Sequence, residues 1–312
     1  MENKILGLHH VTAIAGSVQE NYDFYTKTIG QRLVKKTVNF DDPGTYHFYY
    51  GNEVGSPGSI LTFFPWQGMR KGAAGTGMIS EIGYSVPKNS LGFWENRFKD
   101  SKILHQSRRK RFGEELLSFE DKDGLKFNLV IPKNEDNRKP WTTGEVNEDI
   151  AIKGFHSVVL MLKDISATAR VLTEILGYEL LLQEGNRYRF ITNAIDAANV
   201  IDLLEVPEGS RSIQGAGTNH HVAFRVKDEK TLMHFREKII QYSMSITEKI
   251  DRNYFYSLYF REPGGVLFEL ATDNPGFDVD EPVSELGTHL KLPAQYEKNR
   301  PQIEKTLPQF IQ

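Results

Sequence analysis

The feature that most restricts how this chain can fold is an internal repeat that occurs four times. Each copy opens with a short apolar or alternating run and passes through a polar turn into a helix-like stretch. It ends with two or three runs rich in β-branched and aromatic residues. The opening runs cover residues 8–15, 79–86, 154–162 and 219–226, and the closing runs cover residues 59–64, 125–131, 199–206 and 266–272. This order of elements predicts an α+β fold of four βαβββ modules.

The four modules divide the chain into two predicted domains. Residues 5–131 hold the first two modules, and residues 151–273 hold the last two. Between them, residues 132–150 are rich in Asn, Glu, Asp and Lys and predict a linker. Residues 274–312 form a Pro-rich C-terminal tail, for which an ordered wrap and a contact with a partner both stay open.

The composition limits the kinds of metal site and of partner that the chain can have. The 312 residues include no cysteine, which excludes disulfides and thiolate metal sites, so any metal must be held by imidazole and oxygen ligands. The formal net charge of −3 argues against a nucleic-acid partner or an anionic membrane. No apolar stretch approaches the roughly 18 residues that a membrane span needs, and the N-terminus lacks a signal-peptide pattern. A soluble, cytoplasmic protein is therefore expected.

Residues with ligand chemistry occupy matching places in the four copies. The copies align with His10, Glu81, His156 and His221 at one starting position, and with Thr62, Asn128, Asp202 and Glu269 at one closing position. Side chains alternate between the two faces of a strand. We therefore expect the residues at these positions to point into a cleft enclosed by two facing modules.

The first and fourth copies supply the strongest set of ligands. His10, His221 and Glu269 are two imidazoles and one carboxylate, the facial arrangement of non-haem Fe(II) oxygenases. Such a set leaves coordination positions open for a substrate oxygen and O₂. We predict a catalytic Fe(II) site at these three residues, with Mn(II) as the alternative metal. The second and third copies are open to two interpretations, an oxygen-rich second metal site or a structural pair of modules, and their residues are Glu81, Asn128, His156 and Asp202.

Two histidine pairs support this site. His9-His10 and His220-His221 are the only adjacent histidines in the sequence, and they fall at equivalent positions of the first and fourth copies. Because neighbours in a strand face opposite ways, only one imidazole of each pair is expected to bind the metal. His9 and His220 are expected to support the ligands or to face the substrate.

The fourth copy adds two further polar candidates. Tyr259 and Arg252 precede Glu269 in the strand-like runs of that copy. A tyrosine hydroxyl can donate a hydrogen bond or shuttle a proton near a bound phenolate, and an arginine can hold an anionic oxygen in a dry pocket. The aromatic residues that suit a ring-shaped ligand are Phe63, Phe64, Trp66 and Phe255.

Three motifs resemble the vicinal oxygen chelate superfamily, which includes glyoxalase I, fosfomycin- and bleomycin-resistance proteins and the extradiol ring-cleaving dioxygenases. The motifs are GLHHVT at residues 7–12, NHHVAF at residues 219–224 and REPGGVLFE at residues 261–269. The chain is most similar to the hydroquinone-type ring-cleaving dioxygenases of Gram-positive bacteria. The resemblance implies two tandem domains with curved mixed sheets around a metal cleft.

The resemblance also bears on the choice of the first ligand. Catechol-cleaving members take all three ligands from the C-terminal modules, which would be His156, His221 and Glu269 here. Hydroquinone-type members take one ligand from the first module, which would be His10, and the opening motif with Thr12 favours this scheme. The resemblance further implies a substrate pocket. In this pocket His9 or Tyr259 would be the acid–base group, and the substrate would be bound by His220, Arg252 and Thr12.

The predicted function is therefore an Fe(II)-dependent, extradiol-type ring-cleaving dioxygenase. It would open a hydroquinone or related phenol with O₂, in the breakdown or detoxification of aromatic compounds and quinones. Its expected partners are a small aromatic substrate and O₂, and the sequence is compatible with a homodimer. The alternatives are a catechol-type enzyme, a non-catalytic aromatic-binding protein, and a glyoxalase-like isomerase or thiol-transfer resistance enzyme. Thr62 argues against the last of these, because such enzymes usually have Glu or Gln at that position.

Overall fold

The computed structural model describes residues 3–312, and their strands form two eight-stranded sheets. The first sheet has the order β14-β15-β16-β13-β1-β4-β3-β2 and therefore joins the first module to the fourth. Its strands are β1 (Leu8–Ala15), β2 (Arg32–Val38), β3 (Tyr46–Gly51), β4 (Ile60–Pro65), β13 (Thr218–Val226), β14 (Ile250–Asp251), β15 (Phe255–Arg261) and β16 (Leu267–Pro275).

The second sheet has the order β10-β11-β12-β9-β5-β8-β7-β6 and joins the second module to the third. Its strands are β5 (Met78–Ser85), β6 (Arg109–Arg111), β7 (Glu114–Glu120), β8 (Lys126–Ile131), β9 (Gly154–Leu162), β10 (Glu179–Glu184), β11 (Arg187–Ile191) and β12 (Val200–Glu205). The predicted α+β fold of four βαβββ modules is confirmed, and each sheet combines one module from each half of the chain.

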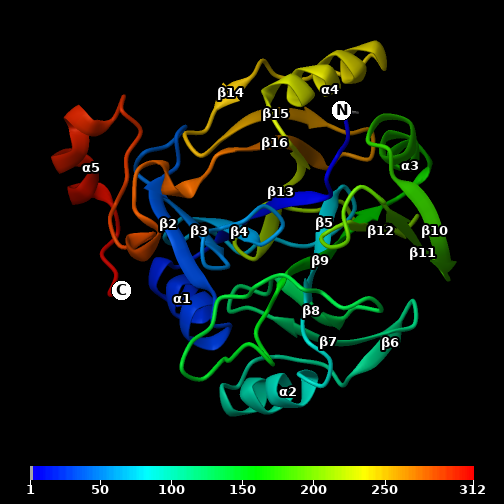
Figure 1. Ribbon diagram of the computed structural model, residues 1–312, viewed down its shortest axis with the longest axis horizontal. Coiled ribbons are helices and arrows are strands. Elements are labelled where there is room, and N and C mark those ends of the chain that lie inside the picture. The colour runs from blue at the N-terminus through cyan, green and yellow to red at the C-terminus, as the bar shows by residue number, and fades with distance from the viewer. Residues whose placement is uncertain (1–2) are drawn as a thin grey trace.

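One helical segment follows the opening strand of each module. α1 (Val18–Asp23) and α3 (Ser166–Arg170) both continue into a π-helical turn, η1 (Phe24–Thr28) and η2 (Val171–Ile175). α2 (Leu91–Asp100) and α4 (Glu229–Gln241) are regular, and they lie at the bottom and top of the view in Figure 1. α4 begins where the Asp228 carboxylate accepts a hydrogen bond from the Thr231 amide.

The centre of the first sheet is formed by strands from opposite ends of the chain. β1 and β13 pair antiparallel, with Thr12 opposite His221 and His10 opposite Ala223. β4 runs parallel to β1, and β16 runs parallel to β13. The two histidine pairs therefore lie on neighbouring strands, although more than 200 residues separate them in the sequence.

The strand register corrects one predicted equivalence. Thr62 and Glu269 pair with Thr12 and Ala223, the second residues after His10 and His221. Asp202 pairs with Val159, the third residue after His156, so Ser157 and not His156 occupies the position equivalent to His10. β9 is buried along nearly its whole length, so its sequence lacks the polar–apolar alternation that would reveal a one-residue slip.

Two of the three connections between modules lie side by side. The segment after β4 and the segment after β12 pair through Ala73 and Ile213, whose backbone groups exchange hydrogen bonds of 2.8 and 2.9 Å. Within residues 132–150, Arg138 donates hydrogen bonds to the carbonyls of Gly58 and Phe155 at 3.0 and 2.7 Å. These contacts connect the two sheets.

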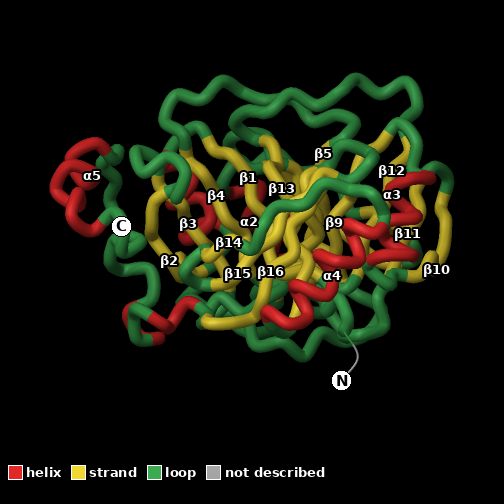
Figure 2. The backbone as a smooth tube through the Cα atoms, turned by 90° about the horizontal axis from the view of Figure 1, so that it is seen from above, coloured by secondary structure: helices red, strands yellow, loops and turns green. Residues whose placement is uncertain are grey.

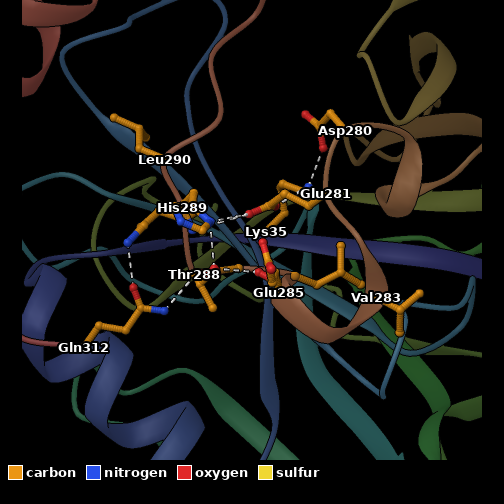
Figure 3. Close-up of polar contacts among 12 residues, drawn as sticks. Lys35, Asp280, Glu281, Val283, Glu285, Thr288, His289, Leu290 and Gln312 are labelled. Atoms are coloured by element: carbon orange, nitrogen blue, oxygen red, sulfur yellow. Dashed lines mark hydrogen bonds and ion pairs between the residues drawn. The ribbon is translucent and has the colours of Figure 1, made fainter.

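The C-terminal tail is an ordered wrap over the β2 edge of the first sheet. Figures 1 and 2 show it with α5 (Arg300–Thr306) outside β2. The backbone amide of Lys291 donates to the carbonyl of Lys36 at 2.9 Å. The fully buried ammonium group of Lys35 lies 2.6 Å from Asp280 and 2.5 Å from Glu281. Figure 3 shows these three residues. Among residues 3–312, no helix has the length and apolar character needed to cross a membrane.

Candidate metal centre

Three side chains converge at the centre of the first sheet. They are His10 from β1, His221 from β13 and Glu269 from β16, all of which are buried. Nε2 of His10 lies 3.3 Å from Nε2 of His221 and 3.1 Å from Oε2 of Glu269. Nε2 of His221 lies 2.9 Å from the same carboxylate oxygen. Within the described part of the chain, this is the one cluster of three or more potential ligands.

The spacing of these donor atoms fits a metal ion. Nitrogen and oxygen ligands lie about 2.1 Å from a transition metal, and two such ligands at right angles are therefore roughly 3.0 Å apart. The three observed separations are close to that value. Oε1 of Glu269 accepts a hydrogen bond from Ser257 at 2.5 Å, whereas the buried Oε2 receives no hydrogen bond. Because a buried carboxylate oxygen without a partner is costly, a cation between the three groups fits the donor set.

His9 determines which nitrogen of His10 is available as a ligand. Nε2 of His9 donates to the carbonyl of Thr272 at 3.1 Å. Burial and the neighbouring His10 keep the pKa of His9 well below its usual value, so its Nδ1 is an acceptor. It accepts the Nδ1 proton of His10 across 2.9 Å, which leaves Nε2 of His10 unprotonated and facing the centre. His9 therefore lies behind the ligand and does not line the cavity.

His220 has the same relation to His221. Their Nδ1 atoms are 2.7 Å apart, and burial lowers the pKa of His220 to about 3. A neutral His220 can accept the Nδ1 proton of His221, so that Nε2 of His221 is free to bind a metal. Burial likewise lowers the pKa of His221. Burial raises the pKa of Glu269, but the neighbouring His10 and His221 side chains hold it well below its usual value.

A cavity of about 260 Å³ opens beside the three ligands. Arg252 and Tyr259 line it, and Nε of Arg252 donates to the Tyr259 hydroxyl oxygen at 3.2 Å. Burial raises the pKa of Tyr259, so its hydroxyl stays protonated at neutral pH. His220 also lines the cavity, together with the aromatic rings of Phe64, Trp66 and Phe255. Phe63, the fourth aromatic residue considered from the sequence, packs in the hydrophobic core instead.

Thr62, at the closing position of the first module, already forms hydrogen bonds to two neighbouring side chains. Thr62 Oγ1 lies 2.8 Å from Thr12 Oγ1 and 2.9 Å from Nε2 of His47. Thr12 is fully buried and, like His9, lies behind the cavity surface rather than on it. The fuller ligand set, with a carboxylate or amide at position 62, is therefore not present.

The cavity residues that the sequence did not reveal include two on β3. His47 and Tyr49 of β3 both line the cavity, and the Tyr49 hydroxyl lies 2.9 Å from Nδ1 of His47. A signal was present in the repeat, because Tyr49 pairs with Thr62 as Tyr259 pairs with Glu269. The signal becomes visible only once the pairing of β3 with β4 is known.

His156 is not part of this cluster. It lies in the second sheet, with Nε2 3.2 Å from Glu114 and Nδ1 3.0 Å from Ser157. The catechol-type combination of His156 with His221 and Glu269 is therefore not assembled.

Arginine side chains occupy the corresponding centre of the second sheet. Arg189 lies 2.8 Å from Asp202 and 2.5 Å from Glu114, and Arg111 and Arg187 contact Glu81 at 2.8 and 2.7 Å. Asn128 also donates to Glu81 at 2.7 Å. Each carboxylate is thus neutralised by a guanidinium group, which agrees with a structural pair of modules and not with a second metal site.

Comparison with known proteins places these observations in a family. The family model described as "Glyoxalase/Bleomycin resistance protein/Dioxygenase superfamily" matches residues 154–270. The Bacillus subtilis proteins MhqO and MhqE, each named "Putative ring-cleaving dioxygenase", are both 46% identical to this chain. The matches cover 99% and 98% of this chain and 98% and 100% of theirs. A "Chlorohydroquinone/hydroquinone 1,2-dioxygenase" of Sphingobium indicum is 33% identical over 98% of this chain and 97% of its own.

Solved structures give the same result for the fold. A crystal structure of a "putative dioxygenase" from Bacillus subtilis matches with a TM-score of 0.95 and 45% identity, covering 99% of both chains. Glyoxalase I from Zea mays has the same fold, with a TM-score of 0.65 and 16% identity over 91% of this chain and 97% of its own. The chain therefore belongs to the glyoxalase, bleomycin-resistance and dioxygenase superfamily, and within it to the group of the MhqO-like ring-cleaving dioxygenases.

Proposed function

We propose that this protein is an Fe(II)-dependent dioxygenase that opens the ring of a hydroquinone or a related phenol with O₂. The observation that carries the proposal is the set of three converging donor atoms of His10, His221 and Glu269, with His10 and His221 lining an aromatic-walled cavity. The name of the Sphingobium relative supports hydroquinones as the substrate class. We propose Mn(II) as the alternative metal.

The metal would be held by His10, His221 and Glu269, where it would supply a Lewis acid that binds a phenolate oxygen and O₂ together. The bond broken would join the hydroxyl-bearing ring carbon to its neighbour. Phe64, Trp66 and Phe255 would contact the ring and exclude water from it. The metal ligands would thus set the position of the reacting carbon, and the cavity walls would set the position of the ring.

Arg252 and Tyr259 are proposed to stabilise negative charge and to transfer a proton. The protonated Tyr259 hydroxyl can donate to an oxygen of the bound substrate, and its proton can follow the charge that develops there. Arg252, which donates to Tyr259, fixes the orientation of that hydroxyl and balances negative charge in the cavity. His9 and His220 fix the tautomers of the two ligand histidines. Acid–base chemistry by His9 stays a prediction, and its two ring nitrogens are both bonded in the structure.

The proposal is tested by measuring oxygen uptake. Protein loaded anaerobically with Fe(II) is mixed with methylhydroquinone in buffer of known O₂ content, and catechol is assayed in parallel. We expect one O₂ consumed per ring opened with methylhydroquinone, and no uptake by Glu269→Gln. Glu115→Gln, an exposed substitution in β7, is the matched control. Absence of uptake with both diols, or turnover of a glutathione hemithioacetal without O₂ under Zn(II) or Ni(II), would contradict the proposal.

A further inference from the structure

The cavity has a second polar side that the proposed mechanism does not use. Tyr49 and His47 lie on β3, across the cavity from Tyr259 and Arg252 of the fourth module. The Tyr49 hydroxyl lies 2.9 Å from Nδ1 of His47, and Nε2 of His47 lies 2.9 Å from Thr62. Thr62 is bonded in turn to Thr12 at 2.8 Å. These four residues form one continuous chain of hydrogen bonds that ends at the cavity.

The position of Tyr49 is the repeat counterpart of Tyr259. Tyr49 pairs with Thr62 in the first module, and Tyr259 pairs with Glu269 in the fourth. Two residues earlier on each strand, His47 bonds to Thr62 and Ser257 bonds to Glu269. The two tyrosines therefore occupy related places on opposite sides of the central strands β1 and β13.

Tyr49 lines the same cavity as two of the metal ligands, His10 and His221. Tyr49 lies opposite Thr62, and Thr62 lies opposite Thr12. Thr12 lies opposite His221, so Tyr49 and His221 are three strands apart, roughly 14 Å between their backbones. Both side chains line the same cavity, which has a volume of about 260 Å³.

The ring of Tyr49 is held from behind by the C-terminal tail. Tyr49 is 2% exposed, and Phe277 packs against it with ring centroids 5.1 Å apart. Lys35 lies opposite Tyr49 in the sheet and is bonded to Asp280 and Glu281 of the same tail segment. Figure 3 shows this anchor. The orientation of the Tyr49 hydroxyl is therefore set before any ligand enters.

His47 lets Tyr49 act as either an acceptor or a donor. Burial keeps the pKa of His47 well below its usual value, so the ring is neutral and has one N–H and one lone pair. If Nε2 donates to Thr62, the Tyr49 hydroxyl donates to Nδ1 and offers a lone pair to the cavity. If Thr62 donates to Nε2, Nδ1 donates to Tyr49, whose proton then points to the cavity. Rotation of the Thr12 and Thr62 hydroxyls allows both arrangements.

We propose that Tyr49, held by His47, binds the second hydroxyl of a para-diol whose first hydroxyl lies at His10, His221 and Glu269. The inference rests on the proposed function and makes it more specific, because it explains how a 1,4-diol is preferred to a phenol without a second oxygen. A 1,2-diol has both oxygens at one end of the ring and leaves Tyr49 without a ligand partner. Tyr49 is thus a specificity-determining residue, and His47 is a positioning residue.

The test compares two ligands that differ in the second hydroxyl. Dissociation constants of hydroquinone and 4-methylphenol are measured anaerobically with the Fe(II)-loaded wild type and Tyr49→Phe. We expect Tyr49→Phe to weaken hydroquinone binding about tenfold, the loss of one hydrogen bond, and to leave 4-methylphenol binding unchanged. Tyr50→Phe is the matched control, because Tyr50 is the next residue of β3 and its hydroxyl bonds to Asn21 at 3.0 Å, away from the cavity.

His47 variants separate positioning from folding. His47→Leu is expected to lower the preference for hydroquinone as Tyr49→Phe does, and His47→Gln to restore part of it, because an amide can again bond to Tyr49. An unchanged ratio of the two dissociation constants in Tyr49→Phe overturns the inference and leaves the proposed function standing. A wild type that binds neither compound and consumes no O₂ with hydroquinone overturns both.

Discussion

At the scale of single residues, the candidate metal centre depends on histidines that do not touch the metal position. His9 and His220 are neutral and buried or nearly so, and each contacts the Nδ1 atom of the ligand histidine that follows it. Without this acceptor, a ligand imidazole is free to rotate or to change tautomer. The paired histidines thus have distinct roles, one to bind and one to orient. Both cannot bind, because neighbouring residues of a strand point to opposite faces.

His9→Ala is therefore expected to weaken metal binding. The loss of a hydrogen-bonded partner of a ligand typically reduces metal affinity by about 10- to 100-fold. The measurement is a competitive titration of the metal-free protein with Mn(II) or Fe(II) under anaerobic conditions. His234→Gln, an exposed histidine of α4, is the control and should keep wild-type affinity. Unchanged metal affinity in a folded His9→Ala variant would contradict the orienting role of His9.

At the scale of elements, the two sheets show what the repeat can and cannot predict. The opening strands were predicted almost residue by residue, because four copies of one pattern support each other. The His156 equivalence was wrong because β9 is buried on both faces and gives no alternation. His47 and Tyr49 were missed because their relation to the cavity is set by the pairing of β3 with β4, which is not written in any local pattern.

The second sheet also provides a prediction on stability and pH. Arg111, Arg187 and Asn128 hold the pKa of Glu81 at about 2, against an ordinary value of 4.5, although burial alone would raise it. Because the folded-state pKa is the lower one, this stabilisation is complete above about pH 4.5 and is lost as the pH falls toward 2. The shift corresponds to a contribution on the order of 3 kcal/mol.

Glu81→Gln should accordingly lower the free energy of unfolding at pH 7 and flatten its dependence on pH between about 4.5 and 2. Urea denaturation at a series of pH values measures both effects. Glu115→Gln in the same sheet is exposed and serves as the control. Equal pH profiles of wild type and Glu81→Gln would show that the arginine pairs do not stabilise the charged carboxylate.

At the scale of the whole molecule, the two ends of the chain build the site together. The first and fourth modules supply the ligands, and the tail returns to close the β2 edge behind Tyr49. Figure 1 shows this tail beside β2. In the sequence, the only sign that the first and fourth copies share a metal was the type of residue at their aligned positions. It left open where the tail lies, because its contacts with β2 are long-range and polar, as in the ion pairs of Lys35.

The tail anchor should contribute strongly to stability. Lys35→Met leaves Asp280 and Glu281 without their buried cation, and breaking such a pair typically costs roughly 3–5 kcal/mol. Chemical denaturation of the metal-free protein measures the change. Lys36→Met is the matched control, since Lys36 is the next residue of β2 and its ammonium group bonds to the side chain of Gln312 at 2.6 Å in an exposed contact. A loss no larger than that of the control would contradict the anchoring role.

The most direct test of the account is to locate iron in the protein. Crystals grown and loaded with Fe(II) under anaerobic conditions give an anomalous difference map at the iron absorption edge. We expect one peak, about 2.0–2.3 Å from Nε2 of His10, Nε2 of His221 and Oε2 of Glu269. A map without a peak at these three atoms, or with the iron bound at His156 and Glu114 of the second sheet, would contradict the account.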